Sequence, residues 1–323
     1  TLTAIKPQGA WPGRATTDGW CGRFRLRTCV GRILLTATAS APTLDSLPRA
    51  PGHDGPVADP PRESPLIEPL LLTATQISTF DGPRLLTKAS GFFFARDGRL
   101  FVVTSRHVVV DEPSRHFPDR VEIELHVDPT NLTQSTGFSM LLYRNGKGIW
   151  HQGRDAAGEI DVAVIEIDRA ALPASTALRA FTPEHLQTSL QDVEVGAPLL
   201  IVGFPLGFHD TLHHLPVVRQ AVIASAFGMR FEGKGYFLTD ARTHRGTSGA
   251  PVVTRASSAD AGIADLPWKL LGVHSARLDM RSRDEQQDES LGLNCAWYAD
   301  ILLTLTADSL EPPAAAAPAG ELP

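Results

Sequence analysis

Apolar residues in this chain are grouped in short runs rich in β-branched and aromatic side chains. The runs are bounded by clusters of Gly, Asp and Pro, as hairpins require. They occupy residues 91–95, 100–104, 121–127, 161–167, 198–204, 217–225, 236–240, 251–254 and 270–275. Runs of this length and composition predict strands. Short helices fit only residues 169–177, 183–190 and 298–305. Strands do not alternate with helices, so the pattern predicts an all-β, mostly antiparallel fold.

Proline usage separates the ends of the chain from its middle. Thirteen of the 25 prolines fall within residues 1–65 and 307–323. Proline lacks an amide donor, and these segments have little apolar surface to offset the entropy of ordering. We expect residues 1–65 to be disordered or loosely packed, residues 66–306 to form the folded body, and residues 307–323 to be a disordered Ala/Pro tail. The N-terminal segment could be a signal or a propeptide, although Arg32 interrupts the continuous apolar run that a signal needs. Both roles stay open.

Charge and cysteine content exclude several classes of protein. Lys and Arg total 30 against 36 Asp and Glu, which gives a net charge of −6. This balance argues against a partner that is a nucleic acid or an anionic membrane. No stretch approaches the ~18 apolar residues of a membrane helix. The three cysteines, Cys21, Cys29 and Cys295, are too few for a disulfide framework.

The strongest chemical signal is the segment GTSGAP at residues 246–251. A serine nucleophile needs a tight, glycine-lined turn that exposes its hydroxyl and points backbone amides at one spot. Ser248 is therefore the candidate nucleophile, and the amides of Gly246 and Ser248 are candidate oxyanion donors. A Gly-Ser turn in an ordinary hairpin has a similar sequence, so the motif alone leaves a structural role open.

A histidine and an aspartate beside apolar runs could complete the site. His107 follows the run 100–104, and imidazole, with an ordinary pKa of about 6.5, suits a general base. Asp161 begins the run 161–167, where a carboxylate needs a partner and could orient a histidine. The alternatives are a structural histidine and a turn-capping aspartate, with Asp155 and Asp168 as nearby competitors.

The order of these residues along the chain separates two hydrolase folds. The α/β-hydrolases have the order Ser, acid, His, but the only histidine after Ser248 is His274, which is too close to hold the intervening elements. The serine is also followed by the predicted strand 251–254 instead of a helix. The order His107, Asp161, Ser248 is that of the chymotrypsin barrels.

Several segments resemble, in order and wording, the trypsin-like peptidases of bacteria, especially the protease domain of HtrA-type proteases without a PDZ domain. They are SGFFFARDGRLFVVTSRHVV, DVAVIEID, LLIVGFPLGF, VIASAFG, TDARTHRGTSGAPVV and LLGVHSA, within residues 88–276. The resemblance implies two six-stranded antiparallel β-barrels, at about 66–180 and 190–306, with the active site in the cleft between them.

The same resemblance assigns the residues. His107, Asp161 and Ser248 would be the catalytic triad, and the oxyanion hole would be formed at Gly246 and Ser248, with Thr247 between them. Ala250 stands where the family more often has glycine, a change that a methyl group should tolerate. No PDZ domain is expected after Leu305, and the cysteine pairs of vertebrate trypsins are missing, which is typical of the bacterial branch.

The substrate pocket would be lined by residues before the nucleophile and by the segment 272–276. Thr243 and His274 match positions at which glutamyl endopeptidases bind an acidic side chain, and Arg242 would add positive potential. This gives the hypothesis of cleavage after Glu or Asp. The alternative is that His274 is a core histidine and that Arg242 points into solvent.

The predicted function is that of a serine endopeptidase that acts on polypeptide substrates through an acyl-enzyme and needs no cofactor. The alternative is a catalytically silent or effector-gated binding module with a protease fold. A metal site at His209, His213 and His214 is not expected, because the segment lacks the Glu of a zincin motif. The sequence leaves the oligomeric state and the compartment open, with a bacterial cytoplasmic location favoured over a periplasmic or secreted one.

Overall fold

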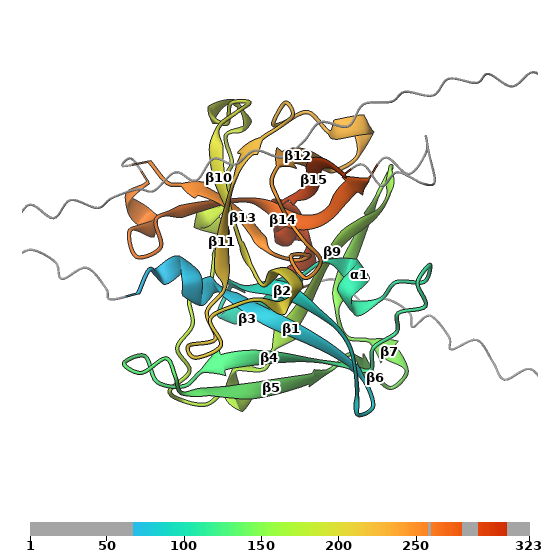
Figure 1. Cartoon of the computed structure of the whole chain (residues 1–323), viewed down its shortest axis with the longest axis vertical. Coiled ribbons are helices and arrows are strands. Elements are labelled where there is room, and N and C mark those ends of the chain that lie inside the picture. Colours follow the sequence, from blue (N-terminus) through green and yellow to red (C-terminus); the bar gives the residue numbers. More distant parts are fainter. Residues whose placement is uncertain (1–66, 258–259, 280–289, 309–323) are drawn as a thin grey trace, which may run out of the picture. The chain divides into compact units, whose positions relative to one another are not determined.

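The described strands form a seven-stranded sheet, a closed six-stranded barrel and a separate two-stranded hairpin (Figure 1). The computed structural model describes residues 67–257, 260–279 and 290–308, all of which belong to one compact unit, residues 62–323. The predictions for residues 1–65 and for nearly all of the tail 307–323 lie outside the described residues. Among the residues described, no helix is long and apolar enough to cross a membrane.

The first half of this unit is a seven-stranded antiparallel sheet in the order β5-β4-β1-β2-β3-β9-β8. Its strands are β1 (Ala74–Asp81), β2 (Arg84–Arg96), β3 (Arg99–Thr104), β4 (Arg120–His126), β5 (Ser135–Leu141), β8 (His151–Asp155) and β9 (Gly158–Ile167). A short separate hairpin consists of β6 (Tyr143–Arg144) and β7 (Lys147–Gly148).

The second half is a closed six-stranded barrel in the order β10-β11-β12-β15-β14-β13. Its strands are β10 (Pro198–Gly203), β11 (Val217–Ile223), β12 (Tyr236–Asp240), β13 (Pro251–Arg255), β14 (Trp268–Asp279) and β15 (Ser290–Tyr298). This confirms the all-β prediction and one of the two six-stranded barrels.

The second predicted barrel is not confirmed, since the strand order of the first half ends at β5 and β8 and the described residues show no ladder between these two strands. The stretch between these edge strands folds back on itself as the β6–β7 hairpin, so it does not carry β5 into register with β8. A backbone hydrogen bond from Ile149 to Leu142, at 2.9 Å, brings the two ends of that stretch together.

Helical segments are short throughout the described residues. The α-helices are α1 (Arg106–Val109) and α2 (Ile301–Leu305). The 3₁₀ turns are η1 (Pro69–Thr73), η2 (Arg169–Ala171), η3 (Pro183–His185), η4 (Leu190–Asp192), η5 (Pro205–Gly207), η6 (Phe231–Gly233) and η7 (Ala261–Ile263). Each of the three predicted helical regions thus contains a single short turn or helix.

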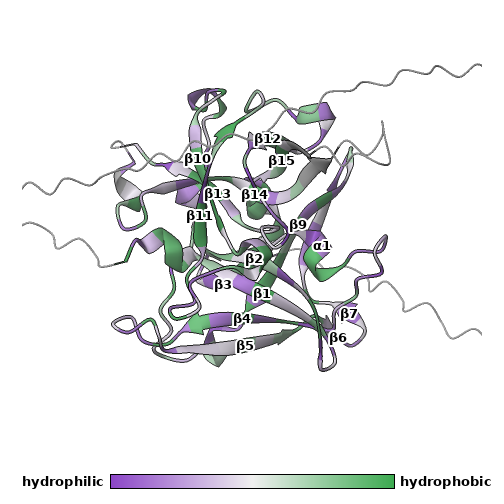
Figure 2. Ribbon diagram, viewed as in Figure 1, coloured by the Kyte–Doolittle hydropathy of each residue, from purple (hydrophilic) through white to green (hydrophobic). Residues whose placement is uncertain are grey.

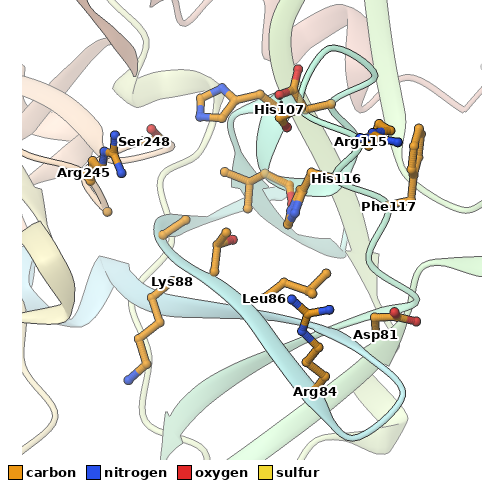
Figure 3. A pocket seen from close by; sticks show the side chains of 16 residues that line it. Asp81, Arg84, Leu86, Lys88, His107, Arg115, His116, Phe117, Arg245 and Ser248 are labelled. Atoms are coloured by element: carbon orange, nitrogen blue, oxygen red, sulfur yellow. Dashed lines mark hydrogen bonds between the residues drawn. The ribbon is translucent and has the colours of Figure 1, made fainter.

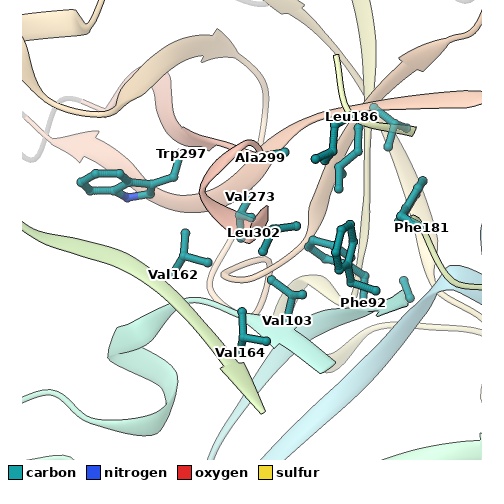
Figure 4. Close-up of a cluster of buried hydrophobic side chains, with 14 of the residues drawn as sticks. Phe92, Val103, Val162, Val164, Phe181, Leu186, Val273, Trp297, Ala299 and Leu302 are labelled. Atoms are coloured by element: carbon teal, nitrogen blue, oxygen red, sulfur yellow. The ribbon is translucent and has the colours of Figure 1, made fainter. Parts of the chain in front are cut away.

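The largest apolar core joins the sheet to the barrel. Phe92 and Val164 from the sheet share one buried cluster with Val273 and Trp297 from the barrel, and Phe181 from the connection packs edge-on against Phe92 (Figure 4). Apolar segments, green in Figure 2, occur in strands of both halves. Separate clusters fill the sheet and the barrel. Because burial of apolar surface is the main favourable term in folding, the shared cluster holds the two halves in one arrangement.

Candidate active site

His107, just after the end of β3, and Asp161, near the start of the neighbouring strand β9, lie side by side. β3 pairs with β9, with Thr104 opposite Ala163, so α1, which follows β3, begins beside Asp161 near the start of β9. His107 Nδ1 lies 2.7 Å from Asp161 Oδ2, and the His107 amide donates to Asp161 Oδ1 at 2.9 Å. The carboxylate therefore holds both the backbone and the ring of the histidine. Nε2 is the ring nitrogen that Asp161 does not contact.

Electrostatics couple this pair. Burial is the largest single effect on the pKa of His107 and lowers it, but the hydrogen bond and the charge of Asp161 outweigh burial, and the net pKa is raised above its usual value. Burial raises the pKa of Asp161, yet bonds from His107 and Ser275 and the charge of His107 leave it lowered. The His107 side chain is 37 % exposed, so a substrate can reach the ring.

Ser275, on β14, adds a contact that the sequence did not indicate. Its hydroxyl donates to Asp161 Oδ2, and its carbonyl accepts a hydrogen bond from Ser248 Oγ at 3.0 Å. Residue 275 falls within the predicted pocket segment 272–276, where the sequence indicates no role for it. A serine inside a strand carries no local signal of this kind, because its partner lies on β9, far away in the chain.

The turn around Ser248 has the glycine geometry that a nucleophile requires. Gly246 has φ +90° and Gly249 has φ +85°, values that side chains other than glycine rarely adopt. A Cβ atom on Gly246 would lie 2.7 Å from the carbonyl oxygen of Phe204. Ala250, which follows, is fully buried in the barrel core, so its methyl group is accommodated.

Backbone hydrogen bonds leave two amides of this turn available. Within the described part of the chain, the N–H groups of Gly246 and Ser248 donate to no partner. The amide of Thr247, by contrast, donates to the His244 carbonyl at 3.2 Å, so it is engaged inside the turn. The geometry thus favours Gly246 and Ser248 as donors to an anionic oxygen, and it does not offer the Thr247 amide.

Ser248 and His107 face the same groove. They line a groove of about 810 Å³ together with β2 and the loop after α1 (Figure 3). Among the described residues, Ser248 Oγ makes no hydrogen bond to His107, since it donates to the Ser275 carbonyl instead. The structure therefore brings the three predicted catalytic residues to one place, with the serine hydroxyl turned towards β14.

The predicted pocket residues lie in different environments. Thr243 and His274 are buried, and the Thr243 hydroxyl donates to Asn294 Oδ1. His274 Nδ1 is buried without a hydrogen-bond partner among the described residues, and burial lowers the pKa of His274 to about 4. Arg242 is exposed. The structure thus places Thr243 and His274 inside the barrel and leaves Arg242 at its surface.

The remaining histidine candidates bind protein groups. His213 Nδ1 lies 2.7 Å from Asp210 Oδ2, and His209 Nδ1 lies 2.6 Å from the Gly207 carbonyl. The ring of His214 lies beside that of His209, with ring centroids 6.1 Å apart. No cluster of three or more His, Cys, Asp or Glu residues that could hold a metal ion occurs among the described residues.

Comparison with known proteins decides the family. The family model described as "Trypsin-like peptidase domain" matches residues 89–259, a range that contains His107, Asp161 and Ser248. The chain belongs to the trypsin-like peptidase family. This confirms the resemblance to the trypsin-like peptidases that is seen in the sequence. No curated protein matches the chain.

Solved structures with similarity to this trypsin-like peptidase include an HtrA-type protease with a tripeptide, at 18 % identity and a TM-score of 0.44, covering 72 % of this chain and 58 % of that one. A serine endoprotease from Yersinia pestis has 15 % identity and a TM-score of 0.42, covering 72 % of this chain and 61 % of its own. The chain spans about three fifths of the length of these two proteins. An M. tuberculosis protein in an inactive form has 16 % identity and a TM-score of 0.41, covering 77 % of this chain and 94 % of its own.

Proposed function

We propose that this trypsin-like peptidase is an endopeptidase in which Ser248, His107 and Asp161 cleave peptide bonds through an acyl-enzyme. The carrying observation is the 2.7 Å contact between His107 Nδ1 and Asp161 Oδ2, with Ser248 on the same groove. A carboxylate on Nδ1 keeps the proton there and leaves Nε2 as the base. Two free amides beside the serine supply the second requirement, a site for the oxyanion.

The steps follow from these positions. Ser248 Oγ attacks the peptide carbonyl while His107 Nε2 takes the hydroxyl proton, and the carbonyl oxygen becomes an anion bound by the Gly246 and Ser248 amides. When the C–N bond breaks, imidazolium returns the proton to the leaving amine, and Ser248 retains the acyl group. Water then attacks the ester, again with His107 as base, which releases the carboxylic acid and restores the hydroxyl.

The position of the Ser248 hydroxyl bears on the alternative of an effector-gated enzyme. Ser248 Oγ donates to the Ser275 carbonyl, so it must rotate about its Cα–Cβ bond to reach His107. Such loose geometry is common in substrate-free proteases and tightens when substrate binds. In the gated alternative, the rotation waits for an effector instead of the substrate.

We also propose that the enzyme prefers an acidic residue before the scissile bond. The support is the pair Thr243 and His274, which flank the nucleophile turn from inside the barrel. A histidine with a pKa of about 4 is neutral at pH 7, so it would recognise a carboxylate as a hydrogen-bond donor and not as a cation. Arg242, being exposed, would contribute potential without a direct contact.

Peptides that differ only in the residue before the scissile bond test both statements. Glu, Ala, Leu and Arg are compared in the full chain and in its Ser248→Ala variant. The proposal expects cleavage by the unmodified chain alone, with Glu preferred and with that preference reduced in His274→Gln. His185→Gln, which changes a buried histidine elsewhere, serves as the control and should keep the preference. Equal rates for Glu and Leu would reject the acidic pocket, and cleavage by Ser248→Ala would reject the triad.

A further inference from the structure

The groove shared by Ser248 and His107 continues well past them. One wall is the start of β2, from Arg84 to Ala89, and the other is the loop that follows α1, from Asp111 to Phe117 (Figure 3). Neither Thr243, His274 nor Ser275 lines it. The groove is therefore a region separate from the proposed pocket for the residue before the scissile bond.

Charge in this groove is opposite to that of the chain. Four cationic side chains line it, against the carboxylates of Asp81 and Asp111, although the whole chain carries a net −6. The cations are Arg84, Lys88, Arg115 and Arg245, and all four are exposed. None of them forms an ion pair with any residue in the described ranges, whereas Asp111 accepts a hydrogen bond from the Ser114 hydroxyl. The cations are thus available to a ligand.

The loop that carries Arg115 is held in place. The amides of Asp111 and His116 donate to each other's carbonyls, at 3.0 and 2.9 Å, and His116 Nε2 lies 3.0 Å from the Val108 carbonyl. Arg115 has φ +54° at the tip of this turn. Phe117, which follows, is 43 % exposed and lines the same groove. Arg115 and Phe117 are therefore presented together on a loop that does not need to be ordered when a ligand binds.

The direction of the substrate follows from the proposed chemistry. His107 must return its proton to the leaving amine, so the part of the substrate after the scissile bond lies on the His107 side of Ser248. The groove begins at Ser248 and Gly246 and runs past His107 to the loop with Arg115. The groove would thus hold the half of the peptide that follows the scissile bond, which leaves first and carries the new amino group.

Resting on the function proposed above, we infer that this groove selects peptides with Asp or Glu in the first positions after the scissile bond. Arg84, Lys88 and Arg115 would bind those carboxylates, and Phe117 would cover the adjoining apolar part of the substrate. Two exposed ion pairs of ordinary strength correspond to a preference of roughly tenfold, or about 1.4 kcal/mol for the two together. Contacts of this kind weaken as salt screens them.

Quenched fluorescent peptides with one common sequence before the scissile bond test this inference. The two positions after the bond are Glu-Glu, Ala-Ala or Lys-Lys. The full chain is compared with the triple variant Arg84→Ala, Lys88→Ala, Arg115→Ala. The control variant is Arg144→Ala with Lys147→Ala, because these exposed cations lie on the β6–β7 hairpin and outside the groove.

The expected result is that kcat/KM for Glu-Glu exceeds that for Ala-Ala roughly tenfold in the full chain and in the control. The triple variant should reduce this ratio to about two, and 0.5 M salt should act in the same direction (~4 Å screening length). An unchanged ratio in the triple variant, or equal rates for all three peptides in the full chain, overturns the inference.

A second measurement keeps the groove testable if no peptide is cleaved, in which case the proposed function fails. Fluorescence anisotropy then compares labelled Glu-Glu and Lys-Lys peptides binding to the Ser248→Ala chain. Tighter binding of Glu-Glu that is lost in the triple variant supports the acidic selectivity of the groove. Equal binding of the two peptides contradicts it.

Discussion

The hydroxyl of Ser90 donates a hydrogen bond to the carbonyl of Gly246 at 2.7 Å, across 156 residues of sequence. Ser90 is fully buried on β2, and its hydroxyl also accepts the amide of Phe204 at 2.9 Å, while its own amide donates to the Ser248 carbonyl at 2.9 Å. One serine of the sheet therefore holds the nucleophile turn of the barrel by hydrogen bonds to Gly246 and Ser248.

Replacing Ser90 with alanine should impair catalysis more than substrate binding. The variant leaves the Gly246 carbonyl and the Phe204 amide buried without partners, at a cost of about 1–3 kcal/mol in stability. Misalignment of the two oxyanion donors should lower kcat by about 10²-fold, with KM changed little. Steady-state kinetics on one peptide measure both constants.

Thr73→Val is the matched control, because Thr73 is also fully buried and its hydroxyl donates to the Leu70 carbonyl. It should lose stability and retain kcat. A Ser90→Ala variant with normal kcat would show that the turn keeps its geometry without this serine.

Gly249→Ala should be far more damaging than alanine at another glycine with positive φ. A Cβ at Gly249 would collide with the Ser90 carbonyl and with Thr104 of β3, whereas one at Gly146, with φ +73°, would meet open space. Gly146→Ala should cost about 1 kcal/mol from backbone strain alone, and Gly249→Ala should cost at least 2 kcal/mol more and abolish activity. Urea unfolding measures the difference, and similar losses in the two variants would contradict the packing around Gly249.

The pH profile should report the coupling of His107 to Asp161. The base must be neutral, so kcat/KM falls as pH drops through the pKa of His107, which is raised above its usual 6.5. Asp161→Asn removes the two largest causes that raise this pKa, the hydrogen bond and the charge of Asp161, and leaves burial, which lowers it. The acid limb should therefore move to lower pH while kcat falls roughly 10⁴-fold. Asp111→Asn should shift the limb by less, because Asp111 is the weakest of the causes acting on His107. A limb that stays in place in Asp161→Asn would refute the coupling.

Buried His274 should make the fold less stable in mild acid. Its pKa in the folded protein is about 4, against roughly 6.5 when unfolded, so between these values the unfolded state binds a proton that the folded state does not. The resulting cost is absent above pH 6.5, grows as pH falls, and reaches roughly 3 kcal/mol near pH 4. Urea titrations at pH 7.5 and 5 in a Ser248→Ala background measure the free energy of unfolding. It should fall less between these pH values in the His274→Gln variant than in the chain that keeps His274. An equal drop would mean that His274 is not the group responsible.

The sequence predicts those strands and turns that are determined by residues adjacent in the chain. The apolar runs mark strands such as β3 and β9, and the glycines around Ser248 mark the turn, because each depends on adjacent residues. β1 was not predicted, since Thr75 and Thr79 occupy buried positions and break the apolar alternation. β8, half-buried along most of its length, gave no apolar signal either.

Long-range contacts account for what the sequence missed at the site. Ser90 and Ser275 are ordinary serines within strands, and their importance comes from partners on other elements, Gly246 for the first and Asp161 for the second. For a similar reason, the sequence alone does not tell whether the seven-stranded sheet closes into the second predicted barrel. Closure depends on whether the edge strands β5 and β8 pair. The β6–β7 hairpin between them has strands of two residues, which are too short to show a hydrophobic pattern.

Labelling by a fluorophosphonate tests most directly whether Ser248 is an activated nucleophile, since only such a serine reacts rapidly at phosphorus. The full chain is labelled at pH 8, digested and examined by mass spectrometry, beside the His107→Ala and Ser248→Ala variants. The account predicts one adduct, on Ser248, formed much more slowly in His107→Ala and absent in Ser248→Ala. No adduct on Ser248, or an equal rate without His107, would contradict it.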